Sequence, residues 1–144
     1  MNISTTRFGR LDINEADVLT FVDGLIGMED CRRWVLLSDA QNESLAWLQS
    51  LDRAEVALAV VSPRRFVPGY QVRVSRREIQ PLGLRDANDA QVLAIISHAN
   101  GALALNLKAP LVIHLQERLG RQLVARDDHP VQHRLNATAV RKSA

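Results

Sequence analysis

The stretch LALNLKAPLVIHLQERLGRQLV, residues 103–124, indicates how this chain folds. Two apolar runs are separated by Pro110, and residues 119–120 are predicted to close a tight turn. Val and Ile at positions 112–113 suit a pleated strand, where branched side chains lose little further rotamer freedom. Proline cannot donate to a sheet ladder, so it is expected at a strand start, an edge or a bulge. We therefore predict an approach strand, a kink at residues 108–110 and a hairpin, as in a strand that turns the corner of a small barrel.

Asn106 stands at the start of the proline-kinked strand, and its side chain is expected to satisfy backbone groups that Pro110 leaves unpaired. Elsewhere, strand patterns recur at residues 3–7, 11–13, 18–22, 34–37, 45–51, 56–61, 71–74 and 92–97. An Asn-Gly pair at residues 100–101 predicts a further hairpin.

Helix patterns are short and few. They fall at residues 28–32 and 75–82, the second with Ser75 and Glu78 at the spacing of a capping box. Many short strands at close, regular spacing are typical of sandwiches and barrels. We predict an all-β, mainly antiparallel fold: a small barrel-like β domain with two or three short helices.

Length and composition indicate one domain. A chain of 144 residues can bury a sufficient core alone, and we expect the domain over residues 1–135 with a disordered tail at 136–144. The single Cys31 excludes an internal disulfide. No signal-peptide pattern opens the sequence and no apolar run approaches a membrane span, so we expect a cytoplasmic protein without membrane partners.

Catalytic and cofactor patterns are missing from the sequence. It has no glycine-rich phosphate loop. His129 and His133 have a zinc-like spacing, but Pro130 lies between them and no helical pattern surrounds them. Cys31 has no histidine near it in sequence to activate it. We predict that the protein is not an enzyme and has no catalytic, cofactor or metal site.

The charge is unevenly distributed along the chain. Residues 1–60 carry 5 Arg and 10 acidic residues, whereas residues 61–144 carry 13 Lys or Arg and 6 acidic residues. The basic half, with arginines at 64–65 and 73–77, raises the alternative of a β-barrel that binds RNA directly. Single-stranded RNA sites interleave basic and aromatic side chains. Because both tryptophans lie in the acidic half, we favour a solvated basic face.

Six short motifs occur in order along the chain: TTRFG at 5–9, TF at 20–21, GLIGME at 24–29, WLQSL at 47–51, VVSP at 60–63 and NLKAPLVI at 106–113. Together they resemble the FliW family of flagellar assembly factors, and the resemblance runs from about residue 3 to residue 135. The family usually has GLPGFE where this chain has Ile26 and Met28.

The resemblance implies a non-enzymatic binding protein of the bacterial cytoplasm with a small β-barrel. Members of the family bind flagellin before export and also bind CsrA, an RNA-binding repressor of translation. The two compete, so export of flagellin frees the factor to antagonise CsrA and restores flagellin synthesis.

One feature departs from the family pattern. Members are generally acidic, which suits capture of a basic repressor, whereas region 73–85 is basic here. The resemblance therefore implies flagellin more directly than CsrA, since an apolar groove can take an amphipathic helix whatever the net charge.

Contact residues are predicted from residue type. Acidic side chains of the first half are expected to meet a basic partner: Glu29, Asp30 and Glu43. Aromatic side chains are expected to act as anchors, because interface hot spots favour them: Trp47, Phe66 and Tyr70. For Trp47 we favour the alternative of a plain core residue.

Overall fold

The computed structural model describes residues 1–99 and 101–135. Asn100, in the predicted hairpin turn, and the tail predicted at residues 136–144 lie outside the described residues. The described part contains eleven short strands, one short α-helix and four 3-10 turns. The predicted all-β class is confirmed, with a single α-helix where two or three short helices were expected.

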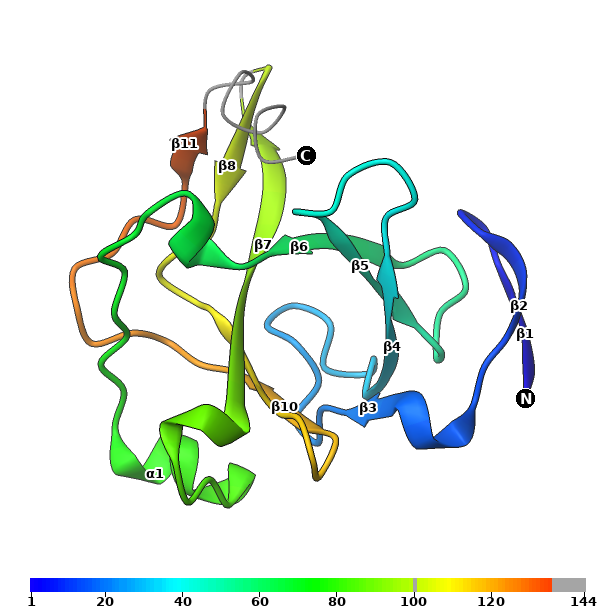
Figure 1. Cartoon of the computed structure of the whole chain (residues 1–144), viewed down its shortest axis with the longest axis horizontal. Coiled ribbons are helices and arrows are strands. Elements are labelled where there is room, and N and C mark those ends of the chain that lie inside the picture. The colour runs from blue at the N-terminus through cyan, green and yellow to red at the C-terminus, as the bar shows by residue number, and fades with distance from the viewer. Residues whose placement is uncertain (100, 136–144) are drawn as a thin grey trace.

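Seven strands close into a barrel (Figure 1). They are β3 (Val18–Thr20), β4 (Arg33–Ser38), β5 (Ala46–Ser50), β6 (Ala57–Val61), β7 (Ala90–Ala99), β9 (Leu111–His114) and β10 (Leu119–Gln122). Around the ring the order is β7, β6, β5, β4, β3, β10 and β9, and a second pairing of β7 with β9 closes it. Every neighbouring pair is antiparallel except β3 and β10, so the fold is mainly antiparallel as predicted.

Strand β7 belongs to two sheets. Its residues 90–93 pair with β9 and its residues 94–95 pair with β6. Beyond the barrel, residues 96–99 pair with β8 (Ala102–Leu105), to which β11 (His133–Leu135) adds. Strand β7 therefore extends beyond the barrel. The chain that follows β6 leaves the barrel wall next to this strand.

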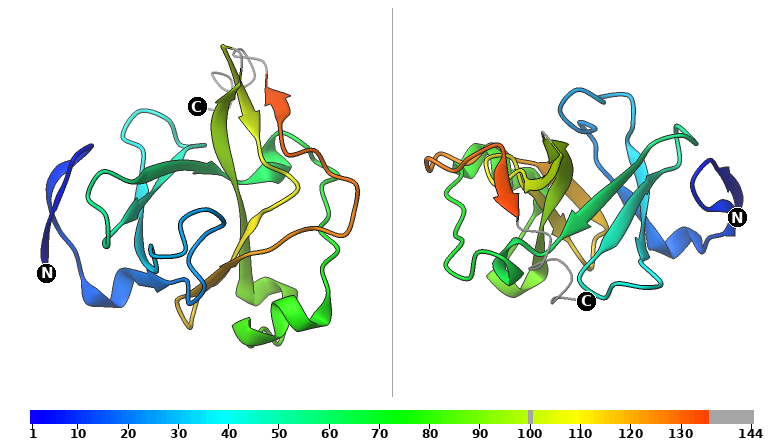
Figure 2. Two further views of the ribbon diagram at one scale, coloured as in Figure 1. Left: turned by 180° about the vertical axis from the view of Figure 1, so that it is seen from behind. Right: turned by 90° about the horizontal axis from the view of Figure 1, so that it is seen from above.

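The strands predicted at residues 3–7 and 11–13 form an N-terminal hairpin, a separate sheet of β1 (Asn2–Thr5) and β2 (Gly9–Asp12). It lies beside the barrel rather than in it (Figure 2). The backbone N–H of Thr6 donates to the carbonyl of Ala54 at 3.0 Å, which fixes the hairpin to the turn between β5 and β6.

The α-helix α1 (Arg76–Ile79) and the following 3-10 turn Gln80–Leu82 confirm the helix predicted at residues 75–82. The hydroxyl of Ser75 accepts from the backbone N–H of Glu78, and Gly83 ends the segment in the left-handed conformation. The remaining 3-10 turns are Glu15–Asp17, Pro63–Arg65 and Ala87–Asp89.

Two predicted elements are wrong. Residues 28–32 form no helix, because Leu25 and Met28 bond to each other's backbone across a tight turn that contains Gly27 at φ +84°. Residues 71–74 form no strand, because their neighbour is the irregular segment at 126–129, which offers single hydrogen bonds instead of a ladder.

The stretch at 103–124 forms a kinked corner, as predicted. The side-chain oxygen of Asn106 accepts from the backbone N–H of Ala109 at 3.0 Å, and the carbonyl of Pro110 accepts from Leu123 at 2.9 Å. The turn was predicted at the wrong place. It occupies residues 115–118, whereas Gly120 lies inside β10 opposite Ile113.

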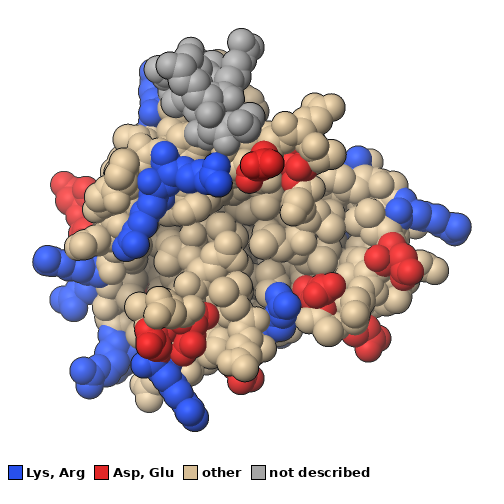
Figure 3. Space-filling view, viewed as in Figure 1, with Lys and Arg blue, Asp and Glu red and all other residues tan. Residues whose placement is uncertain are grey.

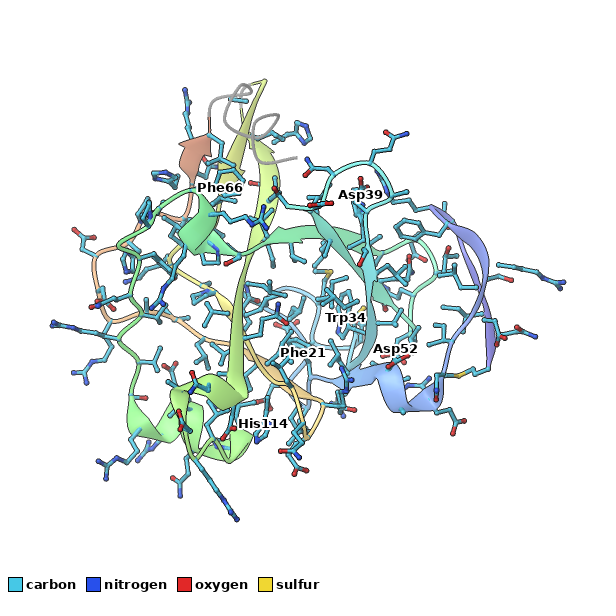
Figure 4. The ribbon with its side chains drawn as sticks, viewed as in Figure 1. Phe21, Trp34, Asp39, Asp52, Phe66 and His114 are labelled. Atoms are coloured by element: carbon cyan, nitrogen blue, oxygen red, sulfur yellow. The ribbon has the colours of Figure 1, made fainter. Side chains whose placement is uncertain are left out.

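Gly120 serves to make room for an aromatic ring. A Cβ atom there would lie 2.3 Å from Cζ of Phe21. Phe21 and Trp34 fill the barrel interior, where both are fully buried and meet edge to face (Figure 4). The loop at residues 22–32 crosses one end of the barrel and adds the buried side chains of Leu25 and Cys31 to this core (Figure 2).

We expect Gly120→Ala to lower the free energy of unfolding by about 1–3 kcal/mol, because the new methyl group displaces the buried Phe21 ring. Thermal denaturation followed by circular dichroism measures the effect. Gly69→Ala is the matched control, since a Cβ at Gly69 meets no atom within 4 Å. Equal melting temperatures for the two variants would contradict the role assigned to Gly120.

We expect Asn106→Ala to lower the free energy of unfolding by about 1–2 kcal/mol, because the backbone N–H of buried Ala109 loses its acceptor. The exposed Gln132→Ala serves as control in the same melting experiment. A normal melting temperature for Asn106→Ala would show that this side chain does not hold the corner.

Candidate partner-binding groove

An apolar groove lies on the outside of the barrel, between β7 and the chain that leads from β6 to α1 (Figure 1). Its volume is about 610 Å³. Its aliphatic lining is contributed by Val72, Val74, Ile79, Leu84, Val92, Val112 and Leu123. The space-filling view shows this face hollowed, with basic side chains above the hollow, acidic side chains directly below it and further basic side chains at the lower edge (Figure 3).

Tyr70 holds the outer wall of the groove to the barrel. Its ring is 3% exposed, and its hydroxyl donates to the carbonyl of Leu107 at 2.7 Å. Burial, with a smaller contribution from the charge of Asp127, raises the pKa of Tyr70 to about 12. The outer wall is therefore anchored by a buried, neutral phenol.

The segment at 126–129 fastens the same wall from outside. The backbone N–H of Arg126 donates to the carbonyl of Arg73 at 2.6 Å, and Nε2 of His129 lies 2.6 Å from the carbonyl of Gln71. The ring of His129 also packs against the Tyr70 ring, with centroids 4.8 Å apart. Two segments far apart in the sequence, 70–73 and 126–129, thus build one wall.

A second cavity of about 500 Å³ adjoins the groove, and Val74 lines both. Its other lining residues are Arg73, Arg126 and Asp127. Partial burial opposes ionisation of Asp127, but hydrogen bonds, including one from the backbone N–H of Arg73, outweigh it and lower the pKa of Asp127. This carboxylate is therefore charged and engaged within the wall.

Comparison with known proteins places this chain in a family. The FliW protein family model matches residues 2–135. The chain belongs to the FliW family of flagellar assembly factors. The flagellar assembly factor FliW of Bdellovibrio bacteriovorus is 37% identical over 131 residues, which cover 90% of this chain and 75% of that protein. FliW of Natranaerobius thermophilus is 30% identical over 139 residues, which cover 94% and 92%.

The fold of a solved FliW agrees with this assignment. The crystal structure of the flagellar assembly factor FliW superposes with a TM-score of 0.86 at 25% sequence identity, covering 93% of this chain and 96% of that one. The barrel described above is thus the FliW barrel.

One of the predicted contact residues of this FliW-family chain, Tyr70, lines the groove, whereas Phe66 is not part of the lining. Phe66 is half-buried and Tyr70 is buried, and both belong to the apolar cluster that includes Leu105 and Leu107 (Figure 4). Tyr70 exposes no ring surface in this conformation, so its contribution to the groove is to position the wall.

Trp47 lies elsewhere, on the outer face of β5, and the prediction that it is a plain core residue is wrong. Its Nε1 donates to Asp39 at 3.0 Å, and this hydrogen bond is the main reason why the pKa of Asp39 is lowered. The guanidinium of Arg7 lies 3.7 Å from the centre of the Trp47 ring, and Phe8 meets its edge. The N-terminal hairpin covers Trp47, while Trp34 takes the core position.

The predicted acidic contacts lie on two loops away from the groove lining. Glu29 and Asp30 are exposed on the loop that crosses the barrel end, where Asp30 lies 3.5 Å from Nε of Arg53. The same loop exposes Ile26, which is 59% accessible. Glu43 is exposed on the loop between β4 and β5. The acidic residues therefore lie apart from the groove lining, on loops at the two opposite ends of β4.

Within 1–99 and 101–135, no group of three or more His, Cys, Asp or Glu side chains is placed to hold a metal ion. In the same ranges, no helix has the length and apolarity needed to cross a membrane.

The environment of Tyr70 predicts a pH dependence. Its pKa is raised from 10.0 to about 12, so the folded state holds the phenolic proton more tightly than the unfolded state. This contribution to stability is complete below pH 10 and is lost as the pH rises toward 12. We expect the melting temperature of the native chain to fall faster over this range than that of Tyr70→Phe.

The chain contains one tyrosine, so phenolate absorbance in the ultraviolet reports Tyr70 directly. A titration midpoint near the ordinary tyrosine value would show that the wall is not anchored by a buried phenol. At neutral pH, Tyr70→Phe is expected to cost about 1 kcal/mol, since the carbonyl of Leu107 loses its donor.

Proposed function

We propose that this protein binds flagellin in the cytoplasm and, through a partner switch, antagonises the translational repressor CsrA to control flagellin synthesis. The action is one of binding, without catalysis or a cofactor. The observation that carries the proposal is an open, aliphatic groove of about 610 Å³ on a member of a family of flagellar assembly factors.

The shape of the groove suits a helical segment of flagellin. An amphipathic helix presents an apolar stripe at positions i, i+3, i+4 and i+7, and such a stripe is buried by laying it into an apolar groove. Here Val72 and Val74 offer one wall, while Val92 of β7 offers surface from the barrel. Burial of this kind depends on apolar area and not on the net charge of the two proteins.

The exposed acidic residues of the two loops that flank β4 are the proposed contacts for CsrA. Glu29, Asp30 and Glu43 are exposed and would complement a basic RNA-binding protein. A factor bound to flagellin is then unavailable to CsrA by mass action, and removal of flagellin by export reverses this. The switch requires that the two complexes exclude each other.

The flagellin half of the proposal is tested by size-exclusion chromatography with the cognate flagellin, where a one-to-one complex is expected. Val74→Glu should weaken the complex at least about tenfold, because an unpaired carboxylate in an apolar contact is strongly disfavoured. Val131→Glu is the control, since Val131 is 59% exposed and lies outside the groove lining. Absence of a complex with the native chain would refute flagellin binding.

The CsrA half is tested by release of a target RNA from CsrA, followed by gel shift. Addition of this protein should free the RNA, and addition of flagellin should restore the CsrA–RNA complex. Glu29→Lys combined with Asp30→Lys should impair release while leaving the flagellin complex intact. Glu15→Lys, also exposed, is the matched control. A shift of RNA by this protein alone would support the alternative of direct RNA binding.

A further inference from the structure

The apolar groove is bordered by cations along its outer wall. Arg64 lines the groove, and Arg73 and Arg126 line the adjoining cavity that shares Val74 with it. All three arginines are exposed. The outer wall therefore combines an aliphatic inner surface with a basic edge.

Two of these three cations have no ionic partner in the described part of the chain. Nε of Arg73 lies 3.8 Å from the carboxylate of Asp127, which offsets its charge. Arg64 donates from Nε to the carbonyl of Tyr70 at 3.1 Å, a neutral acceptor. Within residues 1–99 and 101–135, no carboxylate lies within 4 Å of the guanidinium of Arg64 or Arg126. Their charge is available to a ligand in the groove.

The opposite wall carries no such cationic edge. Its polar lining residues are Asn88 and Gln91, which are uncharged. Asp86 and Asp89 flank Asn88 along the chain, and their carboxylates accept backbone N–H groups of the turn Ala87–Asp89 and of the residues just before it. The exposed Arg85 lies next to them and balances part of this charge. The groove is thus electrostatically asymmetric, basic along one side and neutral to acidic along the other.

We infer that the occupant of the groove is an amphipathic helix whose apolar stripe is bordered by Asp or Glu on one side only. That acidic side lies against Arg64 and Arg126, and the other side faces Asn88 and Gln91. This inference rests on the proposed function only in taking the ligand to be a helical protein segment. Charge complementarity at the rim of an apolar contact sets the orientation and selectivity of binding, and the apolar stripe supplies the burial.

The experiment uses two synthetic helical peptides with the same leucine stripe, one with glutamates along one flank and one with lysines there. Fluorescence anisotropy of labelled peptide measures binding to the full chain. The glutamate peptide should bind at least about tenfold more tightly at low salt, and the difference should shrink as salt screens the exposed charges. Equal affinities, or failure of both peptides to bind, would overturn the inference.

Arg64→Glu combined with Arg126→Glu should reverse the preference between the two peptides. Arg10→Glu combined with Arg134→Glu makes the same charge change at exposed sites outside both cavities and should leave it unaltered. If the control pair shifts the preference as much as the test pair, the selectivity comes from net charge and the assignment to the groove is wrong. Both double variants are checked for an unchanged melting temperature.

The same variants separate this inference from the proposed function. If flagellin binds the native chain but the peptides show no charge preference, the inference fails and the proposed function stands. If the glutamate peptide binds through Arg64 and Arg126 but flagellin does not bind the chain, the inferred preference for an acidic helix is supported. Flagellin is then not the ligand of the groove. Displacement of the glutamate peptide by a single-stranded RNA of matched charge would assign the basic edge to RNA and overturn the inference.

Discussion

The pairing of β7 with β9 is the contact on which the rest of the structure depends, because it closes the barrel. Closure removes the unpaired edges that an open sheet would leave at β7 and β9. It also sets the position of the groove. Strand β7 joins the ring only through residues 90–95 and continues into a second sheet, so the chain after β6 must cross outside the barrel. The groove is the space between that crossing chain and the barrel wall.

Much of the corner could be predicted from sequence, because its determinants are local. Pro110 excludes a ladder donor, Asn106 supplies an acceptor three residues before Ala109, and Ser75 caps α1 at a fixed spacing. Such features depend on neighbours within a few residues. The same locality explains why two strands were expected at the N-terminus, although their turn lies at residues 6–8 and β2 already begins at Gly9.

The wrong predictions concern residues whose role depends on a partner distant in the sequence. Gly120 was interpreted as a turn residue, whereas it provides clearance for Phe21, which no local pattern reveals. Strand alternation correctly placed Trp47 and Leu48 on opposite faces of β5, but alternation does not say which face points inward. The apolar groove was missed for the same reason, since Val74, Val92 and Leu123 come from three separate segments. The alternation of Val72 and Val74 is a weak signal of a lining surface, but the same alternation is also typical of a strand.

The construction of the groove determines which of its two walls can adjust to the proposed helical ligand. The inner wall belongs to β7 and β9 and shares the barrel's hydrogen-bond ladders, so it moves only with the barrel. The outer wall at residues 70–74 has no ladder and is held at separate points by Tyr70, Arg73 and His129. Segments with few backbone hydrogen bonds open at lower free-energy cost than ladder strands. The outer wall, which also carries the basic edge, is therefore the side of the groove that can adjust to a bound helix while the barrel beneath it stays unchanged.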